Sequence, residues 1–580
     1  MKLNEISNNQ HQIIASVFFC ALLVFIRLGY FEIQPGEEGA SAMLARASLH
    51  TSEKGDVPNS VKEITTEKLS DKEQSSTANS QVCIKMEAAF ISVLGESGFA
   101  LRLFSALCSA LSLIMVYLIS KRIVTRQSDG TTIFLLAGTY LWNEYSRQAL
   151  EYVPLAALML LSLWTVIKLF EEKKVFNQYQ WGALIALVMF LLLLTDINFW
   201  FVAVLFIIPF LTQGGYKRQK LILLISSFAA VIIAMLLRSY NSSGNANSLT
   251  SAFYFQYPFL IEKNEHSVLY YINQLVISNP LFLILLVFAI AALFRFKLAR
   301  ERMAATYNKR IVYSVMSWFY LLFIILSAAP GKQRFFTVLL IPPAIILSVW
   351  IAESLTRFIG SAKVRFAVFT SIILSVFWAL SSSLRDAVMK LELQGILLLF
   401  AVLIIMLGIM MLRKERIERR VEAAFGRLLQ ILPAILIFRV TLFIFVPPNE
   451  YSLGAVEMAA KLKESEKSFF VYVYHQNNLA DSMNYQLDWY LKGWMSGEQK
   501  GRTYIPLDLP ANKPDLYKLN ALALFPESFV IYYFNDSAPY RKFIFAEVQR
   551  TRKLLAKTKN YALFGRYTGE GDEKPGKLNL

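Results

Sequence analysis

The sequence predicts a polytopic α-helical membrane protein that carries a soluble α/β domain after its last span. Two observations predict the membrane part. Hydrophobic residues make up 55% of the 580-residue chain, and they fall in runs of roughly 17–25 residues, the length that crosses a bilayer. A third observation predicts the soluble part, because after residue 448 the apolar runs become short and alternate with amphipathic segments.

The apolar runs predict about 13 spans. The first is expected to be a retained span rather than a cleaved signal peptide, because it is long, has only Lys2 before it and ends in no small-residue cleavage site. The expected spans lie near residues 12–31, 99–120, 131–146, 148–168, 180–195, 198–213, 219–237, 278–294, 311–328, 335–355, 364–383, 393–412 and 428–447.

Lysine and arginine collect in every second loop between these spans. The basic loops begin near residues 121, 171, 216, 295, 357 and 413. The positive-inside rule therefore places these loops and the N-terminus in the cytoplasm, and the C-terminal tail outside. This topology accounts for much of the net charge of +17, so the charge does not indicate a nucleic-acid partner.

Two regions on the outer side are large. Residues 1–448 form the expected transmembrane domain, and its first outer loop covers residues 34–98. Residues 449–580 form the expected soluble α/β domain. Its predicted strands are "SFFVYVYH", "SFVIYYF" and "YALFGRYTG", and its predicted helices are "ADSMNYQLDWYLKGWM" and "APYRKFIFAEVQRTRKLLAKT".

Cysteine and histidine are too few and too scattered to predict a metal centre or a disulfide framework. Two of the three cysteines, Cys20 and Cys108, fall inside apolar runs, and no histidine pair has the spacing of a zinc site. The cofactor is therefore unknown: a divalent metal is left open, with no ligand motif to indicate it.

Ionisable residues gather at the outer ends of several spans. A mixture of acids and bases there suits a site that holds an anionic lipid headgroup and carries out acid–base chemistry. Structural explanations stay open beside this one: the acids can favour a helix dipole, the bases can anchor the chain at the interface, and the group around Arg147 can form local ion pairs. The residues are Glu37, Glu38, Arg102, Glu144, Arg147, Glu151, Asp196, Lys332 and Arg334.

Four stretches resemble membrane glycosyltransferases of the GT-C fold, the group that includes bacterial lipid A aminoarabinose transferase and the protein O-mannosyltransferases. "EEGASAMLARAS" is similar to their first-loop motif, with Glu37-Glu38 at the acidic pair and Ala45-Arg46 in register. The segments from Gly95, Ser146 and Pro330 are similar to the second span, the fourth span and a basic turn before a proline-containing span. The motifs cover residues 30–355, and the expected architecture matches over the whole chain.

The resemblance implies a glycosyltransferase that uses a polyprenyl-phosphate sugar as donor on the outer face of the membrane. It implies that Glu37, with Glu38 beside it, deprotonates or orients the acceptor. It implies lipid-phosphate binding by Lys332 and Arg334, with Arg147 and Lys85 as further candidates, and acceptor or structural support by Glu151, Arg46 and Arg102.

The sequence departs from the family pattern at several of these positions. Glu37 stands where the family has Asp, and Lys85 stands in "IKMEAAF" without the prolines of the family's Lys-Pro-Pro motif. Tyr152 replaces the family's fourth-span Asp, and Asp196 replaces a Lys after the fifth span. Asp196 therefore removes one positive charge from the region that the resemblance assigns to phosphate binding.

Two other functions fit the same sequence: a non-catalytic scaffold whose tail binds envelope partners, and a transporter of lipid-linked saccharides. The charges lie at the interface rather than in proline- or glycine-broken spans, which disfavours the transporter. The expected partners are a polyprenyl-phosphate sugar, membrane lipids and a lipid A, glycan or protein acceptor. The expected location is a bacterial inner membrane.

Overall fold

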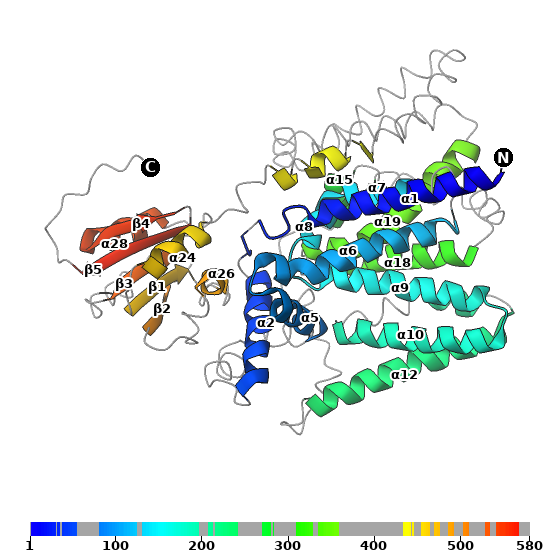
Figure 1. Ribbon diagram of the computed structural model, residues 1–580, viewed down its shortest axis with the longest axis horizontal. Helices are drawn as coiled ribbons and strands as arrows, with labels where there is room; N and C mark the ends of the chain where they lie inside the picture. The colour runs from blue at the N-terminus through cyan, green and yellow to red at the C-terminus, as the bar shows by residue number, and fades with distance from the viewer. Residues whose placement is uncertain are drawn as a thin grey trace, which may run out of the picture. The chain divides into compact units, whose positions relative to one another are not determined.

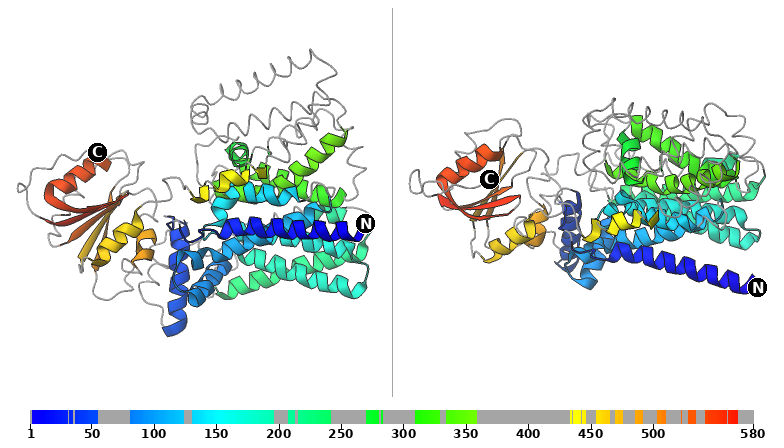
Figure 2. Two further views of the ribbon diagram at one scale, coloured as in Figure 1. Left: turned by 45° about the horizontal axis from the view of Figure 1, so that its top comes forward. Right: turned by 90° about the horizontal axis from the view of Figure 1, so that it is seen from above.

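The structure is a computed structural model, and Figures 1 and 2 show its helices and strands. It describes residues 2–30, 32–34, 37–54, 81–123, 130–195, 207–212, 215–241, 270–279, 282, 309–328, 334–358, 433–434, 436–441, 443–445, 454–464, 469–475, 485–491, 503–509, 522, 528–533, 541–558 and 560–567. Everything below concerns these residues.

The chain divides into two compact units. The first unit is formed by residues 1–26, 105–147 and 151–445, and the second by residues 27–104, 148–150 and 446–580. The helices of the first unit are α1 (Lys2–Phe25), most of α6 (Gly98–Ser120), α7 (Thr131–Gly138), α8 (Tyr140–Ser146), α9 (Tyr152–Glu171), α10 (Val175–Thr195), α12 (Lys217–Asn241), α15 (Tyr270–Ser278), α18 (Lys309–Ala328), the 3-10 turn η4 (Arg334–Phe336) and α19 (Thr337–Phe358).

Six helices in the described part of the chain are long and apolar enough to cross a membrane, so the chain is a multi-pass membrane protein. They agree with the expected spans near 99–120, 148–168, 180–195, 219–237, 311–328 and 335–355. The expected spans near 364–383 and 393–412 lie outside the described residues. The spanning helices are Gly98–Ser120, Tyr152–Glu171, Val175–Thr195, Lys217–Leu237, Arg310–Ala328 and Arg334–Ile351.

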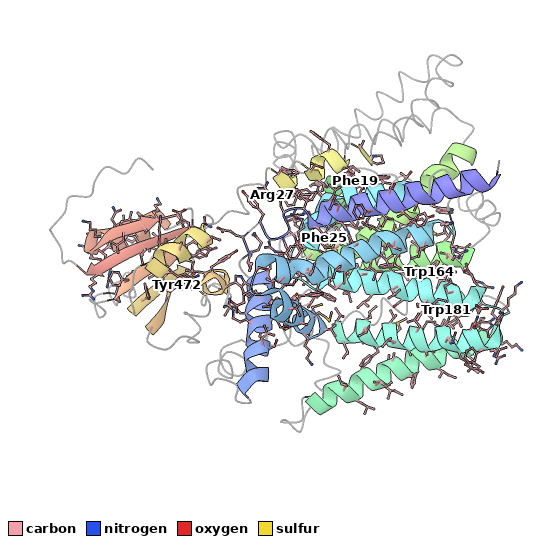
Figure 3. The ribbon with its side chains drawn as sticks, viewed as in Figure 1. Phe19, Phe25, Arg27, Trp164, Trp181 and Tyr472 are labelled. Carbon is pink, nitrogen blue, oxygen red and sulfur yellow. The ribbon has the colours of Figure 1, made fainter. Side chains whose placement is uncertain are left out.

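Basic residues and an aromatic ring mark one end of these helices. Arg122, after α6, forms an ion pair of 3.0 Å with Glu171 at the end of α9. The guanidinium carbon of Arg122 and the ammonium nitrogen of Lys168 lie 5.6 and 4.7 Å from the ring centroid of Trp164, a residue of α9 labelled in Figure 3. The loops after α6 and α9, both predicted to be basic, therefore lie at the same end of the bundle. Tryptophan is common at membrane–water boundaries, so Trp164 fits a position at such a boundary.

The segment 131–146, expected to form one span, is not a single continuous helix but two short helices. The helical path stops at Thr139, whose ψ of 117° is extended, and α8 starts one residue later. The Thr139 hydroxyl donates to the Leu135 carbonyl at 2.7 Å, and Asn279 of the segment after α15 donates to the hydroxyl at 3.0 Å. The hydrogen bond from the Thr139 hydroxyl to the preceding turn and the hydrogen bond from Asn279 stabilise the break in the helix.

The second unit contains a five-stranded mixed sheet with the order β2-β1-β3-β5-β4. The strand β1 (Phe469–His475) pairs in parallel with β2 (Thr503–Leu509) and with β3 (Phe529–Tyr533), whereas β5 (Tyr561–Tyr567) is antiparallel to both β3 and β4 (Arg552–Lys557). Alternate side chains of β1 point to opposite faces of the sheet. Phe470 and Tyr472 of β1 enter one core, and Val471 and Val473 enter the other.

Helices cover both faces of this sheet. The helices α24 (Ala455–Glu464) and α26 (Tyr485–Tyr490) contribute to the core that contains Tyr472, which Figure 3 labels. The helix α28 (Arg541–Thr551) contributes Ile544 and Val548 to the core on the other face. Both faces of the sheet are therefore buried, as expected for an α/β arrangement.

Two expectations for the tail need correction. The helix expected from Ala538 to Thr558 ends at Thr551, because the next six residues pair with β5 as the edge strand β4. The strand β2 was not predicted, since Pro506 interrupts its apolar pattern. Proline is tolerated there because β2 is the opposite edge of the sheet.

The loop expected over residues 34–98 also has a packed core. The helices α2 (Glu37–Lys54) and α5 (Gln81–Leu94) pack through small residues, with Ala42 and Ala45 of α2 buried in one cluster with Ala88 and Ile91 of α5. Small side chains allow the two helix axes to approach closely. The acidic pair of the sequence motif lies at the first turn of α2.

Candidate active site

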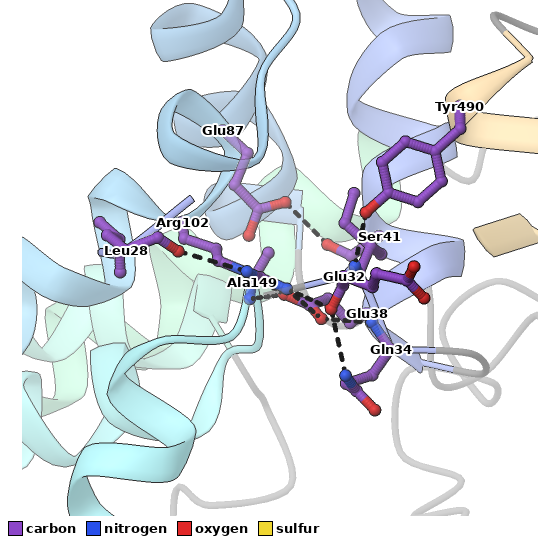
Figure 4. A network of polar contacts seen from close by, with 10 residues as sticks. Leu28, Glu32, Gln34, Glu38, Ser41, Glu87, Arg102, Ala149 and Tyr490 are labelled. Atoms are coloured by element: carbon purple, nitrogen blue, oxygen red, sulfur yellow. Dashed lines mark hydrogen bonds and ion pairs between the residues drawn. The ribbon is translucent and has the colours of Figure 1, made fainter. Parts of the chain in front are cut away.

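Glu38 is the centre of a buried polar network in the second unit (Figure 4). Its side chain is almost completely buried and accepts hydrogen bonds from four donor groups. The guanidinium of Arg102 donates twice, at 2.6 Å from Nε and 3.0 Å from Nη2. The backbone N–H groups of Gln34 and Ala149 donate at 2.7 and 3.0 Å.

The local sequence explains why Glu38 takes this position. It lies in the first turn of α2, where backbone N–H groups have no partner within the helix and a negative charge is favoured by the helix dipole. The Glu38 carboxylate reaches back to the N–H of Gln34, four residues earlier, and the Gly39 N–H donates to the Gln34 carbonyl at 3.1 Å. The extended residues Glu32–Gln34 are thereby fixed to the start of the helix.

Arg102 completes the network from the start of α6. Its remaining N–H groups donate to the carbonyls of Leu28, at 3.2 Å, and Glu32, at 2.9 Å. Both members of the Glu38–Arg102 pair have 1% of their side-chain surface exposed. A buried ion pair is tolerated only when its remaining hydrogen-bonding groups are also satisfied, and here the backbone of Leu28, Glu32, Gln34 and Ala149 satisfies them.

A second buried acid, Glu87 of α5, lies against α2. The hydroxyl of Ser41 donates to its Oε2 at 2.7 Å, and its Oε1 is buried and accepts no hydrogen bond from the described residues. Burial raises the pKa of Glu87 to about 8, and the nearby negative charge of Glu38 raises it further, while the Ser41 hydrogen bond opposes the shift. Glu87 is therefore a neutral acid at neutral pH.

The first unit contains a different acid–arginine pair. Glu144 of α8 accepts two parallel hydrogen bonds from Arg334 of η4, at 3.1 and 2.8 Å. The Glu144 side chain is 5% exposed, whereas that of Arg334 is 40% exposed. The next residue, Phe335, stacks on Tyr152 of α9 with ring centroids 4.1 Å apart. This two-point geometry is also the geometry by which arginine binds phosphate.

Arg147 occupies the C-terminal end of α1, within the first unit. Its guanidinium donates to the carbonyls of Leu23, Val24 and Ile26 at 3.2, 2.9 and 2.6 Å. The carbonyls of Leu23 and Val24 belong to the last turn of α1, where they lack partners within the helix, and that of Ile26 follows directly; a cation is favoured at this end of the helix dipole. The geometry gives Arg147 a structural role, and its binding of lipid phosphate stays a prediction.

The other predicted site residues are dispersed. Lys85 is exposed on α5, and Glu151 is the partly buried N-cap residue of α9. Arg46 is buried in α2 and contacts the tail. The Glu37 side chain, Asp196 and Lys332 lie outside the described residues.

Sequence reasoning missed Glu32, Glu87 and Tyr490, all of which belong to the network around Glu38 (Figure 4). Glu87 was detectable, since it is a lone acid in the apolar stretch "IKMEAAF". Tyr490 was not, because nothing local links a tail tyrosine to the first loop. Among the described residues, no group of three His, Cys, Asp or Glu side chains could hold a metal ion.

Comparisons with known proteins agree with this architecture. The family described as dolichyl-phosphate-mannose-protein mannosyltransferase matches residues 86–239. The chain is similar in structure to ArnT from Cupriavidus metallidurans bound to undecaprenyl phosphate. The match covers 97% of this chain and 99% of ArnT, with a TM-score of 0.60 and 12% sequence identity. The chain has the GT-C fold of membrane glycosyltransferases.

Two further structures share the GT-C fold with this chain. The apo state of the same ArnT has a TM-score of 0.59 at 13% identity, over 97% of this chain and 99% of its own. The Archaeoglobus fulgidus oligosaccharyltransferase tethered to an acceptor peptide has a TM-score of 0.53 at 10% identity, over 90% of this chain and 69% of its own. A search among curated proteins finds no match to the sequence. The GT-C resemblance expected from the motifs is confirmed.

Proposed function

We propose that the chain is a glycosyltransferase that moves a sugar from a polyprenyl-phosphate donor to an envelope acceptor. The GT-C fold over nearly the whole chain carries this proposal, and the ArnT of the same fold binds undecaprenyl phosphate. Lipid A, another glycan or a protein is the proposed acceptor. A lipid-linked donor suits the outer face of a membrane, where nucleotide sugars are absent.

The proposed reaction is a displacement at the anomeric carbon. The bond between that carbon and the phosphate oxygen breaks, the electron pair leaves with the lipid phosphate, and the acceptor oxygen forms the new bond with inversion. Negative charge develops on the leaving phosphate, and fixed cations stabilise it best in a partly dry site. Arg334 is the proposed phosphate-binding residue, with Lys332 and Lys85 as further candidates, because its planar fork is held in a two-point geometry.

Glu37 is the proposed base that takes the proton from the acceptor. Its neighbour Glu38 accepts hydrogen bonds from four donor groups. We therefore propose that Glu38 holds the turn in place rather than taking a proton. A carboxylate at the first turn of a helix is favoured by the helix dipole. Arg102 and Arg46 are proposed as structural support, and Glu151 as support for the acceptor.

The proposed topology follows from the charged loops. Residues 1–448 form a domain of 13 spans with a cytoplasmic N-terminus, and residues 449–580 form an extracytoplasmic α/β domain, in a bacterial inner membrane. A reporter enzyme that is active only outside the cytoplasm, fused after Leu580, should be active. Activity of a cytoplasm-only reporter at that position would contradict this topology.

Lipid profiling of a deletion strain tests the function. The strain is complemented with the wild type, with Glu37→Gln or with Glu547→Gln, a matched acid-to-amide change in α28 of the tail. Without the gene, a sugar should disappear from an envelope molecule and its lipid-linked donor should accumulate. Wild type and Glu547→Gln should restore the sugar, whereas Glu37→Gln should slow transfer roughly 100-fold or more, the usual loss on removing a general base.

Two outcomes would contradict the proposal. Unchanged lipid and glycan profiles in the deletion strain would favour a non-catalytic scaffold or a transporter. Full complementation by Glu37→Gln would remove the catalytic role of Glu37.

A further inference from the structure

The tail contacts the residues that precede the acidic turn. Both regions belong to the second unit. The hydroxyl of Tyr490, the last residue of α26, accepts a hydrogen bond of 2.9 Å from the backbone N–H of Ile33 (Figure 4). The Tyr490 ring packs against both the tail core and the first-loop core. Residues Glu32–Gln34, called here the strap, are thus held at their middle residue.

The strap is also held at its first residue. The carboxylate of Glu32 accepts hydrogen bonds from the N–H groups of Ala455 and Val456 in the first turn of α24, at 3.3 and 3.4 Å. Those N–H groups have no acceptor within their own helix, and the helix dipole favours an acid at this end. The tail therefore contributes two separate helices to the same three-residue segment.

A third contact holds α2 itself. Arg46 donates to the Trp489 carbonyl at 2.8 Å, and its guanidinium lies 4.5 Å from the Trp489 ring centroid. A further bond of 3.2 Å joins Arg46 to Glu96. The Trp489 side chain is buried in the first-loop core with Ala42 and Ala45. Arg46 is therefore the residue through which α26 fixes the orientation of α2.

These contacts form a continuous path to the acidic turn. Tyr490 holds the Ile33 N–H, the next N–H of Gln34 binds the Glu38 carboxylate, and Glu37 is the neighbour of Glu38 in the first turn of α2. Each step is a direct hydrogen bond or a peptide bond. Burial raises the pKa of Tyr490 to about 12, so the hydroxyl keeps its proton at neutral pH while it accepts the Ile33 N–H.

We propose that α24 and α26 of the tail position the acidic turn Glu37–Glu38 for sugar transfer, with Tyr490 as the main positioning residue. The inference rests on the proposed function and makes the tail a working part of the transferase rather than an appended binding domain. A reactive carboxylate displaced by about 1 Å can lose roughly 100-fold in rate, so the effect on transfer should exceed the effect on folding.

The test compares two tyrosine-to-phenylalanine variants of the full chain in lipid nanodiscs. Tyr490→Phe removes the acceptor of the Ile33 N–H and keeps the ring. Tyr533→Phe removes a hydroxyl from another tyrosine of the tail core, on β3, and serves as the control. Lipid extract of the deletion strain supplies donor and acceptor, and a dilution series of the extract gives kcat and KM. Amide hydrogen exchange of the strap is measured in the same samples.

The expected result is a kcat roughly 10-fold lower for Tyr490→Phe, with an unchanged KM for the donor and faster exchange at Ile33 and Gln34. Tyr533→Phe should keep the wild-type kcat and strap exchange. An unchanged kcat for Tyr490→Phe would overturn the inference, as would equal losses in both variants that follow the amount of folded protein. If the wild type transfers no sugar, the proposed function fails, whereas the exchange at Ile33 still decides whether the tail holds the strap.

Discussion

The two units contain two glutamate–arginine pairs with opposite character. The side chains of Glu38 and Arg102, in the second unit, are both 1% exposed and form hydrogen bonds with the backbone of Leu28, Glu32 and Ala149. Glu144 and Arg334, in the first unit, form an equally direct pair, but the arginine is 40% exposed. The first pair is enclosed by protein, and the second presents one partner to its surroundings.

The difference in burial separates two uses of the same chemistry. A fully buried pair cannot lose one member without leaving an uncompensated charge, so it is suited to holding a structure in place. A partly exposed arginine can also contact a phosphate from its open side, because both anions suit the planar fork. We therefore expect Glu38–Arg102 to control stability and Glu144–Arg334 to control ligand binding.

The largest expected effect breaks the buried pair. Glu38→Gln leaves the Arg102 cation without its counter-charge, and should lower the free energy of unfolding by about 3–5 kcal/mol. Thermal unfolding of the purified protein in nanodiscs measures the change. The matched variant Glu144→Gln should lower it by less than about 1 kcal/mol, because Arg334 remains partly solvated. Equal losses for the two variants would contradict the comparison.

The next effect concerns transfer. Arg334→Gln should lower kcat/KM for the lipid-linked donor by about 100-fold, the usual loss when one group that stabilises developing charge is removed. Because Arg334→Gln also leaves the nearly buried Glu144 without this partner, the rates are compared at equal amounts of folded protein. Arg334→Lys keeps the charge without the planar fork and should recover part of the rate. A normal rate for Arg334→Gln, measured with donor extracted from the deletion strain, would exclude a phosphate contact.

Glu87 sharpens the comparison, since it is as buried as Glu38 but accepts a hydrogen bond at only one oxygen atom. Its carboxyl has a pKa of about 8 in the folded chain against an ordinary value of 4.5. As the pH rises from 4.5 to 8, the unfolded chain releases this proton while the folded chain keeps it, so Glu87 lowers stability over this window. The Gln side chain of the Glu87→Gln variant does not titrate, so it does not lower stability in this way.

Glu87→Gln should therefore unfold about 2–4 °C above the wild type at pH 8, and the difference should vanish below pH 4.5. Melting curves of both proteins across this pH range measure it. Glu457→Gln, a change at an exposed acid of the tail helix α24, is the control and should shift the wild-type curve by little at any pH. A variant less stable than the wild type at pH 8 would show that Glu87 is ionised and paired there.

The smallest expected effect concerns competition between the Glu144 carboxylate and a phosphate for Arg334. Glu144→Gln removes the carboxylate that competes with phosphate, so undecaprenyl phosphate should bind roughly 3- to 10-fold more tightly. A binding titration with undecaprenyl phosphate in nanodiscs measures the affinity. Weaker binding would mean that Glu144 orients Arg334 for the ligand rather than competing with it.

The sequence by itself determined the helical membrane class, the position of six described spans and the strands β1, β3 and β5. Hydrophobic run length and two-residue alternation report how each segment meets its surroundings, so local pattern was sufficient. Local pattern failed where contacts with distant segments set the secondary structure. Thr139, which accepts a hydrogen bond from Asn279, ends α7, and residues 552–557 form a strand because β5 pairs with them.

Only the tertiary structure decided which charged residues are partners. The acidic pair was visible at the start of α2, but Arg102 lies 64 residues from Glu38, Ala149 lies 111 residues away, and Tyr490 is 457 residues from Ile33. Periodicity shows that a residue faces inward and does not show what it meets there. The division between a saturated structural acid and an exposed arginine depends on burial by distant segments, which the chain acquires only when it folds.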